Sequence, residues 1–187
     1  MKIKLLTATA GVIALAMPAF AASSSESFDV EASVPESCLM EDIGMVDLSE
    51  LDIVRSSGPD ALSLESNATG NGGDFYLSCN LENSVTISTA NGGLTNSTRS
   101  LDADDDPVFT DTIEYRVRLD NYVDGGNGAQ PKLTTKDGGA GYSTTSAQRG
   151  AIHRQVQAQV TILRADNPLR PLAGDYSDTV TVEVSTL

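Results

Sequence analysis

The residues in this sequence best suited to chemistry are acids, and their densest cluster is residues 102–106 (DADDD). Carboxylates at the first, third and fifth positions match the start of a calcium-binding loop. The match ends there, because Pro107 occupies the position that requires glycine and Ile113 stands where a bidentate glutamate belongs. The cluster is therefore predicted to be a solvated acidic turn, with weak calcium bridging between copies of the chain as the alternative.

No other group of residues points to catalysis. The single histidine, His153, lies beside Arg154, and no nucleophile motif of the GxSxG type accompanies it. No pair of acids stands out as a glycoside-cleaving pair, and aromatic residues, which sugar sites usually need, make up only 5% of the chain. One histidine and two cysteines exclude most zinc patterns. We expect a protein that is not an enzyme and has no metal and no cofactor.

Length and charge narrow the class of protein further. The chain has 187 residues, of which 40% are hydrophobic, so we expect one domain with a real core. It carries 26 acidic against 12 basic residues, a formal charge of −14. Nucleic-acid binding is excluded because phosphates need clustered Lys and Arg, and docking on an anionic membrane surface is disfavoured for the same reason.

The N-terminus has the pattern of an export signal. Lys2 and Lys4 precede an apolar stretch at residues 5–17, and Ala19-Phe20-Ala21 offers small residues for cleavage. The stretch is about a dozen residues long, too short for a membrane-spanning helix of roughly 20. Residues 1–21 are therefore predicted to be a signal peptide, and the remaining chain to be exported without membrane insertion.

Export bears on the two cysteines, Cys38 and Cys79. Thiols pair in oxidising compartments, and neither a CxxC motif nor a nearby histidine suggests a redox or catalytic role. A disulfide between them is predicted, closing a loop of 41 positions. Chain entropy gives such a crosslink about 4 kcal/mol of stabilisation.

The exported part of the sequence is predicted to be almost entirely β-strand. Apolar and polar residues alternate in several segments, which is the period of a strand with one buried face. The segments are 27–34, 75–79, 85–87, 113–119, 156–162 and 176–184. No long stretch has a helical period, so the fold class is all-β, and short strands with one disulfide suggest an immunoglobulin-like sandwich.

Glycine-rich clusters between these segments are predicted to be turns. They are Asn71-Gly72-Gly73, Asn91-Gly92-Gly93 and Asp124-Gly125-Gly126. The Gly-, Thr- and Ser-rich residues 124–150 are predicted to form one long surface loop.

The two ends of the pattern suggest an incomplete sandwich. The apolar strand at residues 176–184 is followed by only three residues, so nothing after it supplies another strand. Apolar and polar residues alternate in residues 27–34, and a flexible Ser-rich leader precedes them. This leader would let the segment extend away from its own domain. A sandwich without its last strand exposes an apolar groove and unpaired backbone, which an outside strand can fill. The alternative is that residues 27–34 pair within their own domain.

The closing segment carries a family resemblance. Residues 173–184 (AGDYSDTVTVEV) resemble the last motif of the spore coat protein U domain family, whose members include subunits of archaic chaperone/usher pili. The order of Cys79, Val85, Ile87, Gly93 and residues 113–120 (IEYRVRLD) is also similar to that family. Cys38 and Cys79 fall where its disulfide is expected.

The resemblance implies a pilus subunit whose immunoglobulin-like sandwich lacks its last strand and is completed by donor-strand exchange. Residues 22–36 would be the N-terminal donor-strand extension and residues 37–187 the sandwich domain. The inserted side chains would be Phe28, Val30, Ala32 and Val34. The wall of the acceptor groove would consist of Tyr176, Val180, Val182 and Val184.

The same resemblance implies partners and a location. The partners would be a periplasmic pilus chaperone, an outer-membrane usher and further copies of this or related subunits. The chain would pass through the periplasm into a cell-surface fibre that supports adhesion or biofilm formation. The alternative is a stand-alone secreted β-sandwich module that binds calcium or carbohydrate.

Tyr176 has two possible roles. It is either a tyrosine corner, whose hydroxyl holds the turn into its strand, or an ordinary half-buried tyrosine.

Overall fold

The computed structural model describes residues 24–123, 130–148 and 150–187. The chain divides into two units, Met1–Val34 and Pro35–Leu187. The predicted signal peptide, residues 1–21, lies outside the described residues. Residues 24–34 of the first unit form no helix or strand, and Phe28, Val30 and Val34 are each more than four-fifths exposed.

The second unit is all-β, which confirms the predicted fold class. Among its described residues, two short 3-10 helices interrupt the strands, η1 (Thr135–Asp137) and η2 (Arg164–Asp166). In the described part of the chain the strands are β1 (Cys38–Met40), β2 (Ala68–Cys79), β3 (Asn83–Thr89), β4 (Leu94–Asn96), β5 (Phe109–Thr110), β6 (Thr112–Ile113), β7 (Arg116–Asp120), β8 (Lys132–Thr134), β9 (Ser143–Gln148), β10 (Ile152–Ile162), β11 (Arg170–Pro171), β12 (Tyr176–Ser177) and β13 (Val180–Thr186).

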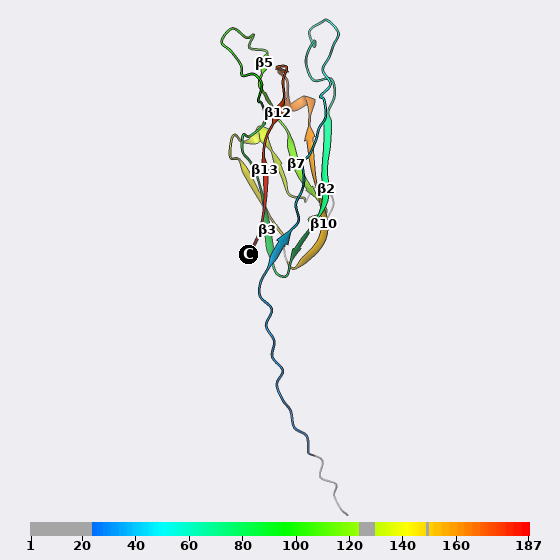
Figure 1. Cartoon of the computed structure of the whole chain (residues 1–187), viewed down its shortest axis with the longest axis vertical. Helices are drawn as coiled ribbons and strands as arrows, with labels where there is room; N and C mark the ends of the chain where they lie inside the picture. Colours follow the sequence, from blue (N-terminus) through cyan, green and yellow to red (C-terminus); the bar gives the residue numbers. More distant parts are fainter. Residues whose placement is uncertain (1–23, 124–129, 149) are drawn as a thin grey trace, which may run out of the picture. The chain divides into compact units, whose positions relative to one another are not determined.

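Two sheets build the body of this unit. The larger has the order β1-β2-β10-β7-β8 and the smaller β13-β3-β9, and all of their neighbours are antiparallel. Figure 1 shows β3 beside β13 and β2 beside β10. Two small sheets, β12-β4-β6 and the parallel pair β11-β5, complete the unit.

One core lies between the two main sheets, as in a β-sandwich. It takes alternate residues from the larger sheet, among them Phe75, Val117 and Val156, and packs them with Val85 and Ile87 of β3. These are the alternating apolar positions that the sequence pattern places on one face of each strand. Because both sheets contribute to a single core, the fold is consistent with a β-sandwich.

The disulfide between Cys38 and Cys79 is present, as predicted. The two cysteines are direct partners in the register of β1 and β2, with their Cα atoms 4.1 Å apart. Asn80 adds to this attachment: its side chain accepts a hydrogen bond from the Ser37 N–H (2.8 Å) and donates one to the Pro35 carbonyl (2.7 Å). The short strand β1 is thereby fixed at the edge of the larger sheet.

The prediction of a turn at Asn71-Gly72-Gly73 is wrong. These residues lie inside the twelve-residue strand β2. A Cβ at Gly70 would come within 2.9 Å of Val46 Cγ1, and one at Gly72 within 3.3 Å of Ile43 Cγ2. The glycines therefore give another stretch of chain room to lie directly on the strand, which is a known use of glycine in strand interiors.

The prediction of one long loop at residues 124–150 is also wrong in part. The described residues in this range contain β8, η1 and β9, with Leu133 and Thr135 fully buried. A run rich in Thr and Ser still forms strands because its partners in β3 and β7 supply the backbone pairing. Asn91-Gly92-Gly93 forms a turn as predicted, with Gly92 at φ 74°, and Asp124-Gly125-Gly126 lies outside the described residues.

The described residues contain no helix with the length and apolar character that crossing a membrane requires.

Candidate functional site

Within the described part of the chain, one edge of β13 has no partner strand. The Ala90 N–H donates to the Thr179 carbonyl (2.9 Å), and the Leu187 N–H donates to the Glu82 carbonyl (3.0 Å). Backbone groups alternate between the two edges of a strand, so the odd-numbered residues of β13 bond to β3. The N–H and C=O groups of Val180, Val182 and Val184 therefore point the other way, where no strand of the described chain pairs with β13.

The chain that follows β1 lies across from this edge. Figure 1 shows β1, in blue, close to the C-terminal end of β13, although the two strands do not pair. Residues 42–48 then leave the sheet without forming a strand, and their N–H and C=O groups make no hydrogen bond to another described residue. Ile43, Val46 and Leu48 hold this segment by packing on Gly70 and Gly72 of β2.

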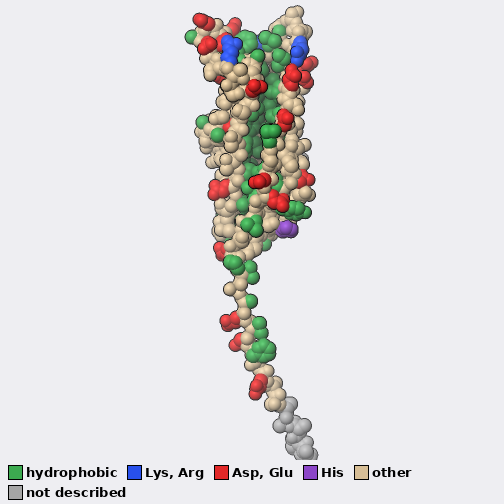
Figure 2. Space-filling model, in the orientation of Figure 1, with side chains coloured by type: hydrophobic (Ala, Val, Ile, Leu, Met, Phe, Trp, Pro, Cys, Tyr) green, Lys and Arg blue, Asp and Glu red, His purple; other side chains and the backbone are tan. Residues whose placement is uncertain are grey.

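An apolar cavity of about 280 Å³ lies between the two walls. Its floor is made by Val117 of β7 and by Ala158 and Val160 of β10. Val180 and Val182 line one wall, and five residues of the segment after β1 line the other. Those five residues are Ile43, Gly44, Met45, Val46 and Leu48. Figure 2 shows the cavity as an apolar groove, in green, running along this face of the domain. We call it the β13 groove.

The β13 groove ends at a polar pair. The Tyr115 hydroxyl donates to Asp178 Oδ2 (2.8 Å), and both residues line the cavity beside Leu94. The N–H groups of Asn91 (2.9 Å), Gly93 (3.3 Å) and Thr179 (2.7 Å) also donate to the Asp178 carboxylate. Burial and the neighbouring Asp178 carboxylate raise the pKa of Tyr115 far above its ordinary value. The pair thus joins three places: the residue before β7, the β3–β4 turn and the residues just before β13.

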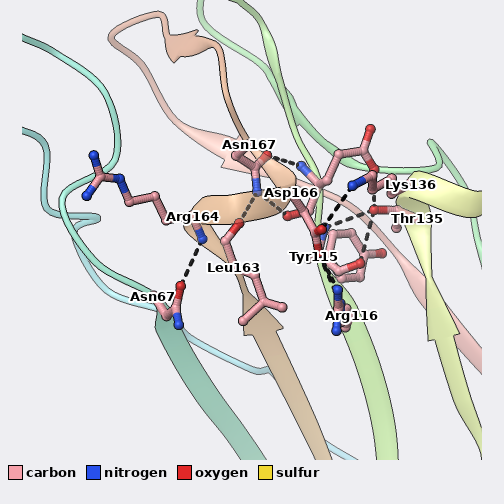
Figure 3. A network of polar contacts seen from close by, with 10 residues as sticks. Asn67, Tyr115, Arg116, Thr135, Lys136, Leu163, Arg164, Asp166 and Asn167 are labelled. Carbon is pink, nitrogen blue, oxygen red and sulfur yellow. Dashed lines mark hydrogen bonds and ion pairs between the residues drawn. The ribbon is translucent and has the colours of Figure 1, made fainter. Parts of the chain in front are cut away.

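A polar network behind Tyr115 fixes the backbone immediately before β7 (Figure 3). The Tyr115 N–H donates to Thr135 Oγ1 (2.9 Å), and the Glu114 N–H donates to Asn167 Oδ1 (2.7 Å). Asn167 in turn donates to the Glu114 and Leu163 carbonyls. These bonds tie the beginning of β7 to η1 and η2, so the position of Tyr115 at the groove is set from both sides.

Ion pairs close the same network. Asp166 accepts hydrogen bonds from Arg116 Nη2 (2.6 Å) and Lys136 Nζ (3.1 Å). Burial opposes its charge, but the hydrogen bonds from Lys136 and Arg116 outweigh this and lower the pKa of Asp166. All three residues are therefore engaged in holding η1 and η2 against β7.

The predicted groove residues lie in two places. Val180 and Val182 line the β13 groove, and Val184 continues the same face of β13 and packs against the core. Tyr176 lies in β12, which pairs with β4, and it is not among the cavity residues. Its hydroxyl donates to the Leu172 carbonyl (2.8 Å) four residues upstream, which is the contact of a tyrosine corner. Burial raises the pKa of Tyr176.

Sequence reasoning missed the wall formed by residues 42–48 and the polar pair Tyr115–Asp178. The segment 42–48 has no period-two pattern because it is not a strand. Its position could have been inferred only from the glycines of β2, which leave space for it.

The acidic cluster at residues 102–106 forms a turn, and its carboxylates accept hydrogen bonds from the backbone of that turn. Asp105 Oδ2 accepts a hydrogen bond from the Asp102 N–H (2.9 Å), and its other oxygen pairs with Arg99. The backbone hydrogen bond from Asp102 is the main cause that lowers the pKa of Asp105; burial opposes it, and the Arg99 charge adds to the lowering. Asp106 Oδ1 accepts from the Val108 N–H (3.0 Å). Among the described residues no group of three or more His, Cys, Asp or Glu is arranged to hold a metal ion.

His153 lies on the exposed outer face of β10. Its Nδ1 is 2.7 Å from Ser78 Oγ, and its ring stacks on Tyr76 with 5.3 Å between centroids. Both partners belong to β2, so the histidine contacts the neighbouring strand on the outer face of the larger sheet and does not line the β13 groove.

Comparison with known proteins gives no match: no family model, no curated protein and no solved structure aligns with this chain. The functional argument therefore rests on the β13 groove and on the residues that line it.

Proposed function

We propose that this chain is a structural, non-enzymatic subunit of an exported surface fibre, assembled by donor-strand exchange. In this proposal its domain is an immunoglobulin-like sandwich that lacks one strand. The observation that supports this proposal most is that the edge of β13 without a partner among the described strands lies along an apolar cavity. Exposed edges with apolar neighbours are poorly tolerated in water unless something covers them.

The proposed occupant is the N-terminal segment Phe28–Val34 of a second copy. Its seven residues match the seven of β13 in length, about 20 Å at 3.3 Å per residue. Phe28, Val30, Ala32 and Val34 would enter the cavity while the backbone pairs with Val180, Val182 and Val184. Burying the three large side chains contributes on the order of 5 to 9 kcal/mol, at about 1.5 to 3 each.

The contact joins two different surfaces, a groove on one copy and an N-terminal segment on the next. Such heterologous contacts build open filaments when the rotation between copies does not close. In the family that the closing segment resembles, a periplasmic chaperone lends the first strand and an outer-membrane usher directs exchange. We propose the same partners here, with adhesion or biofilm formation as the role of the fibre.

A substitution pair on the two faces of the donor segment tests the proposal. Val30→Asn places an amide without a partner in the apolar cavity, whereas Asp29→Asn places the same side chain on the outward face. We expect fibres, seen by electron microscopy after export, to be lost with Val30→Asn and kept with Asp29→Asn. Normal fibres from Val30→Asn, or a wild-type protein that stays monomeric and folded without a chaperone, would overturn the proposal. The second result would favour a stand-alone binding module.

A further inference from the structure

We propose that donor-strand insertion into the β13 groove is opposed by like charge, so that the ionic strength of the medium controls it. This inference rests on the proposed function, since it takes the N-terminal segment of a second copy as the occupant. It concerns the charges on the rim of the β13 groove and on the outward face of that segment, which are separate from the apolar residues that enter the cavity.

Acidic side chains stand on both walls of the β13 groove. Glu183 is exposed on β13 between the cavity-lining Val182 and Val184, which packs against the core. Asp42 and Asp47 are exposed on the opposite wall, next to the cavity-lining Ile43 and Val46. Figure 2 shows acidic atoms, in red, along both sides of the apolar hollow.

No basic residue offsets these acids on either wall. Residues 35–54 and residues 171–187 contain neither Lys nor Arg. On β7, which supplies part of the floor, Arg116 is bound to Asp166 and Arg118 is hydrogen-bonded to Asp120 (3.0 Å). The field along the groove is therefore negative.

The occupant has the same sign. Asp29 and Glu31 alternate with the apolar residues of the donor segment, and residues 22–37 contain no Lys or Arg. When the apolar face enters the cavity, the period of two places both acids on the outward face. Neighbouring strands are about 4.8 Å apart, so these acids come to lie beside the rim acids. Like charges facing one another across paired strands are destabilising.

Screening weakens this repulsion without weakening apolar burial. The Debye length falls from about 30 Å at 0.01 M salt to about 3 Å at 1 M. Insertion should therefore strengthen as salt is added, which is the opposite of the salt dependence of a charge-complementary contact. A strand with the same apolar residues and a basic outward face should be the better occupant at low salt.

Peptide binding to the full exported protein tests this proposal. The probes are a labelled peptide of residues 27–35 (SFDVEASVP), a lysine version (Asp29→Lys, Glu31→Lys) and a neutral version (Asp29→Asn, Glu31→Gln). At about 10 mM salt we expect the lysine peptide to bind roughly tenfold more tightly than the native one, and at about 0.5 M only about twofold. Glu183→Gln should strengthen native-peptide binding about two- to threefold and leave the neutral peptide unchanged.

Two failures are distinguishable in this experiment. If all three peptides bind with equal affinity at both salt concentrations, the charge proposal is wrong and the groove remains a strand acceptor. If none binds at any salt concentration, or if a peptide with Val30→Asn binds as well as the native one, the proposed function itself is wrong.

Discussion

The Tyr115 hydroxyl donates a 2.8 Å hydrogen bond to Asp178 Oδ2, and this bond connects the larger sheet to the residues that precede β13. Tyr115 is buried, and Asp178 holds three further N–H donors from the β3–β4 turn and from Thr179. The Asp178 carboxylate therefore fixes where β13 begins. It also fixes the end of the β13 groove that lies beside Tyr115.

Removing the two partners should have unequal effects on stability. Tyr115→Phe deletes one donor and leaves the carboxylate with its three N–H donors, so we expect a loss of about 1 kcal/mol in the free energy of unfolding. Asp178→Ala leaves the buried hydroxyl and the turn N–H groups without an acceptor, and we expect a loss of about 2 to 3 kcal/mol. Urea denaturation measures both. Equal losses would contradict the role given to Asp178.

Stability should fall at high pH through Tyr122. This side chain is fully buried, its hydroxyl donates to Asn83 Oδ1 (2.8 Å), and burial raises the pKa of Tyr122 to about 12 against an opposing effect of Arg154. The folded state thus holds the phenol proton more strongly than the unfolded chain, where the pKa is about 10. This contribution is complete below pH 10 and is lost as the pH rises from about 10 to about 12, by up to about 1.4 kcal/mol per pH unit.

Tyr122→Phe should flatten this pH dependence. Urea denaturation between about pH 9 and 12 measures the slope, since a phenylalanine has no proton to release. Tyr76→Phe is the matched control, because the Tyr76 side chain is 44% exposed whereas that of Tyr122 is fully buried. A Tyr122→Phe protein with the same slope as the wild type would argue against the buried phenol as its source.

A methyl group added at Gly70 of β2 should displace residues 42–48, which form one wall of the β13 groove. A Cβ at Gly70 would lie 2.9 Å from Val46 Cγ1 and 3.0 Å from both the Asp47 carbonyl oxygen and Leu48 Cδ2. We expect Gly70→Ala to cost about 1 to 3 kcal/mol of stability by overpacking. Gly73→Ala is the control, since its nearest neighbour, the Ile43 carbonyl oxygen, is 3.9 Å away. Thermal unfolding should separate the two variants, and equal midpoints would contradict the close packing of residues 42–48.

The strands of the core could be predicted because their side chains alternate in the sequence as they do in the sandwich. Val156, Ala158 and Val160 are apolar at every second position and are buried at every second position. The same alternation predicts that Val180, Val182 and Val184 share one face, and the structure places all three against the core.

The opposite wall of the β13 groove could not be predicted, for two physical reasons. Residues 42–48 have no regular period, because they are held by side-chain packing on β2 and not by a strand ladder. The glycines beneath them resemble turn residues, since a glycine that makes room for a neighbouring chain looks the same in a sequence as one that allows a positive φ. Tyr115 and Asp178 are 63 positions apart, and only the packing of two sheets brings them together.

The disulfide should act chiefly on the groove wall. β1 has three residues and pairs only with β2 in the described chain, so Cys38–Cys79 is its main attachment. We expect Cys38→Ser to cost about 2 to 4 kcal/mol of stability and to lower the yield of exported protein. Cys79→Ser should behave alike, and the double variant should lose no more than either one, because all three remove the same bond. Hydrogen exchange should show the greatest loss of protection in β1 and the adjoining part of β2. Equal loss throughout the domain would mean that the disulfide stabilises the whole sandwich and not this wall in particular.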